Sequence, residues 1–370
     1  MTTRTIILLI PPLYALCGIS APAQVKSVAV PRPCIVSISL SGGSIVVVPW
    51  DKGMLQAGIT GDGDGECAPN IHVVGATIAI DGGGCGDDNL TVSLPINSSL
   101  RLGTSAGDIS IQGPITGDVM CETSAGDISI AAVRGDVHLA TSGGNLSTGV
   151  VDGSCELRTS GGDVVVKSIS GRLRITSAGG LIRIGTMAQG GVLESSGGEV
   201  RIDTVRGTAR ITTAGGTIDA GTVSGQIDLS TGGGDIFLHN GAGTIKVSTS
   251  GGNIAVAAFQ GSLTATTAGG DIRVGFRPGH PAPGRIVSAG GDITLMIPSG
   301  CAATIDATIR VRGRWWNQGD QFSISSGFPQ NTTRDDNARE IRSTIRPGGG
   351  GDLIVVETVN GNIEVVAPKQ

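Results

Sequence analysis

The sequence predicts an all-β protein, a parallel β-solenoid (β-helix) of about 13 rungs with a capping segment at each end. One short phrase is repeated: TSAGDISI at 104–111 returns unchanged at 123–130 and in varied form down to SAGGDITL at 288–295. The first ten copies start 17 to 19 residues apart. Glycine accounts for 62 of 370 residues and stands in phase between alternating apolar residues. A fixed period with glycine at the corners is typical of stacked β-rungs.

The repeat that begins at Thr123 shows the element expected in every rung. Gly126 is expected to permit a positive φ at the first corner. Ile128 and Ile130 then point inward by the two-residue alternation of a strand, and Gly135 marks a second corner before another short strand. Residues at the position of Ile128 should therefore stack in one inward column: Ile109, Ile128, Leu146, Val164, Ile182, Val200, Ile218, Ile236, Ile254 and Ile272.

The chain is expected to divide into four segments: a signal peptide (1–23), a solenoid start with Gly/Asp-rich loops (24–102), the repeat core (103–300), and a C-terminal cap with the last rung (301–370). Residues 6–16 are apolar, and Ala21-Pro22-Ala23 supplies an A-x-A cleavage site, so export is predicted. Lipidation at Cys17 is an alternative that the large preceding residue, Leu16, disfavours. No later segment reaches about 18 uninterrupted apolar residues, so no transmembrane helix is expected in the mature chain.

Six cysteines remain after the predicted cleavage. Cys67 and Cys85 lie in Gly/Asp-rich loops, and we predict that they form a disulfide, which an exported protein can keep. Cys121 and Cys155 fall at inward positions of the repeat and are predicted to be small buried hydrophobic side chains. A pairing of Cys34 with Cys301 stays open. No C-x-x-C spacing occurs, so no zinc site is expected.

Composition and loop motifs argue against several kinds of ligand. The net charge of −5 comes without long charge runs, and no basic patch is visible for nucleic acid or an anionic membrane. The acidic run that begins at Asp62 departs from an EF-hand loop at its sixth and twelfth positions. Residues 83–91 fit a single calcium nonapeptide, and an ordinary Gly/Asp turn is the alternative. No cofactor is expected.

Catalysis finds little support in these residues. The four histidines show no metal or nucleophile spacing with Asp, Glu or Cys: His72, His138, His239 and His280. Some parallel β-helices are polysaccharide lyases or hydrolases, but they need clustered acids or bases in a groove. The outward acids here fit a solvated surface: Glu156, Asp219 and Asp228. We therefore predict that the protein is not an enzyme.

The sequence resembles the bacterial putative-adhesin family, a domain of unknown function, and is more distantly similar to adhesin-head GIN domains. SGGSIVVVPWDKG at 41–53, the tandem TSAGDISI core and GGDLIVVETVNGNIEVV at 350–366 carry the resemblance, which spans about residues 36–366. The resemblance implies a β-solenoid at the cell envelope and brings no catalytic residues. The Cys-bearing loops between residues 61 and 89 are outside its pattern.

Three functions follow in order of support: an adhesin-like binding scaffold at the surface or in the periplasm, a purely structural envelope protein, and a carbohydrate-active β-helix enzyme. A scaffold should bind through extended surface, and an envelope polysaccharide or a surface protein is the partner to consider. One outward strip is basic in its middle, where Arg183 and Arg201 are the candidate binding residues for an acidic partner. Trp315-Trp316 either binds a ligand or packs on the solenoid end.

Overall fold

The computed structural model describes residues 25–31, 33–60, 68–82, 89–279, 282–313, 321–337 and 339–367. Its fold is all-β, a β-solenoid of about 11 turns with extra sheet segments, which confirms the predicted fold class. Strands near the two ends pair antiparallel and form these extra segments instead of completing further rungs. The chain forms two compact units, Met1–Gly180 and Leu181–Gln370, which are described separately.

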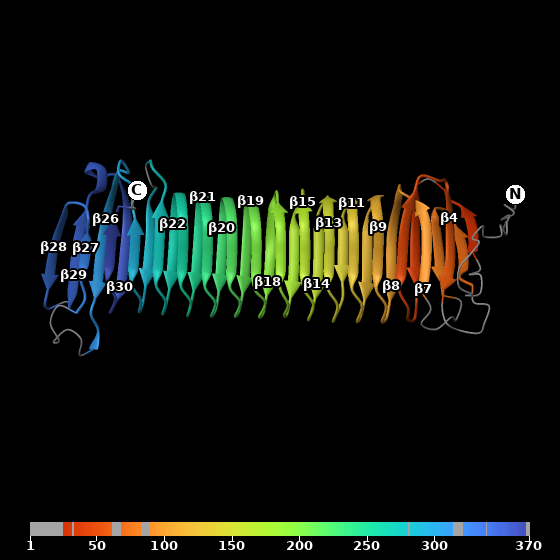
Figure 1. Cartoon of the computed structure of the whole chain (residues 1–370), viewed down its shortest axis with the longest axis horizontal. Coiled ribbons are helices and arrows are strands. Elements are labelled where there is room, and N and C mark those ends of the chain that lie inside the picture. The colour runs from red at the N-terminus through yellow and green to blue at the C-terminus, as the bar shows by residue number, and fades with distance from the viewer. Residues whose placement is uncertain are drawn as a thin grey trace, which may run out of the picture. The chain divides into compact units, whose positions relative to one another are not determined.

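In the first unit, strands one repeat apart pair in parallel and keep the predicted register (Figure 1, red to yellow-green). Ile109, Ile128, Leu146 and Val164 are successive partners, and none of them is exposed. The strands are β1 (Val25–Ala29), β2 (Cys34–Ser39), β3 (Ile45–Trp50), β4 (Met54–Thr60), β5 (Asn70–Val74), β6 (Thr77–Asp81), β7 (Asn89–Pro95), β8 (Ser98–Thr104), β9 (Ile109–Thr116), β10 (Val119–Thr123), β11 (Ile128–Arg134), β12 (Val137–Ala140), β13 (Leu146–Asp152), β14 (Cys155–Thr159), β15 (Val164–Ile169) and β16 (Leu173–Ser177).

The second unit continues the pattern with longer strands. Four strands of 14 residues each pass through the second glycine corner without losing their parallel pairing. Its predicted column residues, from Ile182 to Ile272, are at most 1 % exposed. The elements are β17 (Ile182–Met187), β18 (Gly190–Ser195), β19 (Val200–Thr213), β20 (Ile218–Thr231), β21 (Ile236–Thr249), β22 (Ile254–Thr267), β23 (Ile272–Phe276), β24 (Gly284–Ser288), β25 (Ile293–Met296), β26 (Ala303–Arg310), β27 (Ile324–Ser326), β28 (Gln330–Asp335), β29 (Glu340–Ile345), the 3-10 helix η2 (Pro347–Gly349), β30 (Asp352–Val359) and β31 (Ile363–Val366).

The first residue of the repeated phrase holds adjacent turns together from inside the corner. Thr141 is buried, and its hydroxyl donates to the Gly126 carbonyl of the preceding turn at 3.0 Å. The same oxygen accepts the backbone N–H of Gly144 at 3.2 Å. Equivalent bonds recur at most corners in both units. A buried hydroxyl with both roles satisfied explains why Thr or Ser begins each copy.

The glycine at the corner is required for a reason other than the one predicted. Gly126 does not have a positive φ; the second-corner Gly135 does, at 150°. A Cβ at Gly126 would instead lie 2.0 Å from the carbonyl oxygen of Gly107 in the preceding turn. Close approach of two backbones therefore selects glycine at the first corner; at Gly135 a positive φ is combined with a similar approach, 2.5 Å from a Cβ to the Gly117 carbonyl oxygen.

The acidic or amide residue after that glycine links the turns on the outside. The backbone N–H of Asn145 donates to Asp127 Oδ1 at 2.7 Å, and that of Asp163 donates to Asn145 Oδ1 at 2.8 Å. The second unit repeats the arrangement from Asp235 to Asn362. The G-D and G-N pairs of the repeat are thus structural, because each side-chain oxygen satisfies a backbone donor of the next turn.

In each unit, two strands are inserted between pairs of strands that lie far from them in the sequence. In the first unit, β2 lies between β6 and β8, and β3 between β7 and β9. In the second unit, β30 lies between β24 and β26, while β31 lies between β25 and β27. The last strands of the chain are therefore internal, and β29 and β28 continue the sheet beyond β26.

Candidate functional site

The two arginines predicted to form a binding face lie on adjacent strands of the second unit. Arg183 of β17 and Arg201 of β19 are register partners, and both are exposed. Arg201 Nε donates to Glu199 Oε1 at 2.7 Å, and this hydrogen bond raises the pKa of Arg201 above its ordinary value. A nearby carboxylate therefore already balances one of the two charges.

The same outward strip changes character on the next strands. Asp219 of β20 is the register partner of Arg201. Its Oδ1 atom lies 2.9 Å from Nε2 of His239. Phe237 of β21 follows Asp219 in the strip, and 38 % of its surface is exposed. In the first unit the strip carries no charge: Ser110, Ser129, Ser147 and Val165. The strip thus combines basic, acidic and aromatic side chains only in the second unit.

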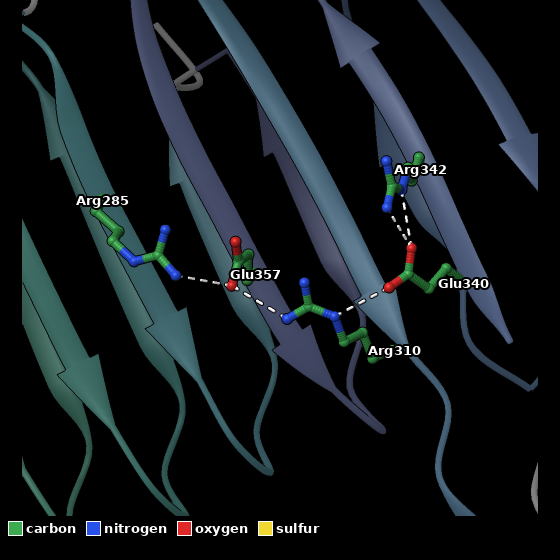
Figure 2. A network of polar contacts seen from close by, with 5 residues as sticks. All are labelled: Arg285, Arg310, Glu340, Arg342 and Glu357. Atoms are coloured by element: carbon green, nitrogen blue, oxygen red, sulfur yellow. Dashed lines mark hydrogen bonds and ion pairs between the residues drawn. The ribbon is translucent and has the colours of Figure 1, made fainter. Parts of the chain in front are cut away.

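A second group of charged side chains, which the sequence reasoning missed, crosses four strands of the second unit (Figure 2). Arg285 Nη2 of β24 donates to Glu357 Oε2 of β30 at 2.9 Å, and Arg310 Nη1 of β26 donates to the same oxygen at 3.3 Å. Arg310 Nε also donates to Glu340 Oε1 of β29 at 3.0 Å. Arg342, on β29, donates to Glu340 Oε2 from Nε at 2.9 Å and from Nη2 at 2.6 Å. We name these five residues the arginine ladder.

The arginine ladder exposes its positive groups more than its negative ones. The side chains of Arg285, Arg310 and Arg342 are 54 %, 44 % and 61 % exposed, whereas those of Glu357 and Glu340 are 18 % and 13 % exposed. Hydrogen bonds from Arg342 and Arg310 hold the pKa of Glu340 below its ordinary value, and Glu340 raises that of Arg310. Glu340 is thus held ionised, and the five residues together present three guanidinium groups against two carboxyl groups.

The sequence carries only one local signal for the ladder. Glu340 and Arg342 are two residues apart, which places them on one face of a strand. The other contacts join residues 30 to 72 positions apart. They form because β30 pairs between β24 and β26, and no local pattern reveals that insertion.

Residues 76–244 match the family model described as Toastrack DUF4097. This segment belongs to the toastrack family. It is shorter than the stretch over which the sequence resemblance was expected, residues 36–366. Arg183, Arg201 and Phe237 lie inside the toastrack segment, whereas the arginine ladder lies wholly C-terminal to it.

Solved structures of adhesion-related bacterial proteins are similar to the chain at low identity. A putative adhesin from Parabacteroides distasonis is 15 % identical with a TM-score of 0.31, over 74 % of this chain and 96 % of that one. A putative adhesin from Bacteroides fragilis is 15 % identical with a TM-score of 0.24, over 76 % and 100 %. A putative cell adhesion protein from Clostridium sporogenes is 7 % identical with a TM-score of 0.16, over 94 % and 100 %. No curated protein matches the chain.

Two cysteines of the toastrack segment occupy the inward positions predicted for them. Cys121 pairs with Leu139, and Cys155 pairs with Val137. Burial raises the pKa of the Cys121 thiol far above its ordinary value and that of Cys155 to about 12. Both are therefore protonated, apolar side chains of the core. Cys34 and Cys301 are also buried and free.

Several other predicted features lie outside the described residues: Cys67, Cys85, the acidic run at Asp62 and Trp315-Trp316. Within the part of the chain that the structure describes, no group of three or more His, Cys, Asp or Glu side chains is arranged to hold a metal ion. The described residues also contain no helix long and apolar enough to cross a membrane.

Proposed function

We propose that the chain is an exported, non-enzymatic binding scaffold of the cell envelope, adhesin-like in role, and that its arginine ladder binds an acidic polysaccharide. The observation that carries the proposal is the exposure of three guanidinium groups above two shielded carboxylates. The chain as a whole has a net charge of −5, so an acidic polymer is expected to be attracted where exposed guanidinium groups accompany shielded carboxylates.

The geometry of the ladder suits an extended ligand. Its five residues lie on strands of one sheet in the order β24, β30, β26 and β29, with the arginines on β24, β26 and β29, so the row spans three strand spacings, about 14 Å. Among the residues that the structure describes, Arg285 donates only from Nη2 to Glu357, which leaves its other N–H groups for a ligand. A guanidinium group can hold a carboxylate through two parallel hydrogen bonds. A linear chain of acidic sugars therefore meets several cations along one direction.

Affinity chromatography tests the proposal. The purified chain should be retained on immobilised polygalacturonate at low salt and released at high salt, because exposed charges are screened. Replacing Arg285 and Arg342 with Ser removes the two outer cations, while Arg310 still bridges Glu340 and Glu357 and keeps the strands tied. This double variant should elute at much lower salt than the parent chain.

A control variant separates the ladder from general charge effects. Arg134→Ser removes an exposed cation of the first unit, whose side chain is 77 % exposed beside Asp152, and should elute with the parent chain. Arg183→Ser with Arg201→Ser tests the predicted strip in the same way. Equal retention of the ladder variant and the parent would refute the assignment of the ladder. No retention of any form would favour a purely structural envelope protein, and stronger retention on DNA would favour a nucleic-acid partner.

Location and the absence of catalysis are separate parts of the proposal. Cell fractionation with protease treatment of intact cells should find the chain outside the cytoplasm, as the pattern of residues 1–23 predicts. Incubation with the polysaccharide should leave the polymer length unchanged. Recovery in the cytoplasmic fraction would contradict export, and release of short oligosaccharides would favour the carbohydrate-active enzyme.

A further inference from the structure

The second feature of the surface is an exposed aromatic ring with a polar pair on one side and, one strand further away on the other side, an arginine. Phe237 alternates with the buried Ile236 and Leu238 on β21, so its ring is on the outer face of the sheet. His239, two residues further on, is on the same face and is paired with Asp219. The side chain is 38 % exposed, so part of the aromatic surface is open to a ligand.

On the side away from β20, the neighbour of Phe237 is a small side chain, and an arginine lies on the strand beyond it. Ala255 of β22 is the register partner of Phe237, and Arg273 of β23 is the partner of Ala255. Arg273 is exposed and forms no ion pair with any residue that the structure describes. Phe237 and Arg273 are thus two strand spacings apart, about 9.6 Å between backbones, with only a methyl group between them.

We propose that Phe237 and Arg273 form a subsite for an acidic sugar of the polysaccharide class considered above. A pyranose ring has one face lined with C–H groups, and this face packs on the phenyl ring. The sugar carboxylate then pairs with Arg273, and ring hydroxyls bond to Asp219 and His239, which are already oriented by their mutual contact. The proposal rests on the function proposed above but uses none of the residues of the arginine ladder.

Calorimetry with short ligands tests the subsite on the full chain. The titrants are an oligogalacturonate and its methyl ester, which keeps the ring and loses the charge. Phe237→Ala should weaken binding of both by about tenfold, a loss of about 1.4 kcal/mol, because both ligands lose the ring on which they pack. Phe237→Tyr should bind like the parent, and Arg273→Gln should weaken binding of the acid but not of the ester.

Val165→Ala is the matched control, because Val165 occupies the same strip in the first unit and is similarly exposed, 41 % against 38 %. Unchanged circular dichroism of each variant confirms that it is folded. Equal affinity of Phe237→Ala and the parent overturns the subsite, as does a parent chain that binds neither oligomer. If that parent chain is still retained on the polymer column, only the subsite is refuted. If the chain binds the oligomers but is not retained on the column, only the ladder is refuted.

Discussion

Of two adjacent glycines at one corner, only one should be sensitive to substitution by alanine. An ideal Cβ at Gly144 would lie 1.9 Å from the Gly126 carbonyl oxygen and 2.9 Å from the backbone nitrogen of Asp127, both in the preceding turn. At Gly143 the nearest atoms are 4.0 Å away. Gly144→Ala therefore requires a backbone shift, whereas Gly143→Ala fits the space that is present.

The size of the effect follows from the bonds that the shift breaks. Reaching even 3.0 Å, the shortest separation that real Cβ atoms show, requires the two turns to move apart by about 1 Å. Three hydrogen bonds between the two turns at this corner would lengthen: Thr141 to Gly126, Ser142 to Ser124 and Asn145 to Asp127. At about 1 kcal/mol each, Gly144→Ala should lower the free energy of unfolding by about 3 kcal/mol. For Gly143→Ala we expect a change within about 0.5 kcal/mol.

Thermal unfolding followed by circular dichroism measures the difference. About 3 kcal/mol corresponds to a Tm lower by roughly 6–12 °C for a unit of this size, while Gly143→Ala should leave Tm nearly unchanged. The chain itself supports the second expectation, because Ala125 and Ala106 stand at the position of Gly143 in the two preceding copies. Equal melting temperatures for the two variants would refute the argument from close approach of the backbones.

Three further predictions concern the core, the thiols and the ladder. Ile236→Asp places an unpaired charge in the column and should lower the free energy of unfolding by more than about 4 kcal/mol; an unchanged melting curve would contradict the column. Cys121 and Cys155 should react with iodoacetamide at pH 8 only after denaturation, because their raised pKa values keep them protonated, whereas mass spectrometry of exported material should find Cys67 and Cys85 already joined. The pKa of Glu340 is lower in the folded protein than in the unfolded protein, where it is about 4.3. Its ion pairs therefore stabilise the fold when the pH is above about 4.3, and this stabilisation is lost as the pH falls through the pKa of the folded state. The Tm of Glu340→Gln should therefore lie below that of the parent at pH 7 and approach it at pH 3, and a constant difference would count against the pairing.

The repeated phrase by itself determined the all-β class, the period and the register. A two-residue alternation repeated at a fixed interval can bury its apolar face only by stacking copy on copy, so Ile128 had to meet Leu146 and Cys121 had to meet Leu139. The sequence also placed Arg183 beside Arg201, because both occupy the same position of the phrase.

The tertiary structure alone decided what lies outside that phrase. Gly126 looks in sequence like a residue with positive φ, and only the stacked backbones show that contact with Gly107 excludes a side chain. The arginine ladder exists because β30 enters between β24 and β26, which brings Glu357 to Arg285 and Arg310 from 72 and 47 residues away. The alternation of apolar and polar residues specifies which face of a strand a side chain occupies. It does not specify which strands become neighbours once the repeat has ended, because that pairing depends on which distant strand edges can bury apolar surface together.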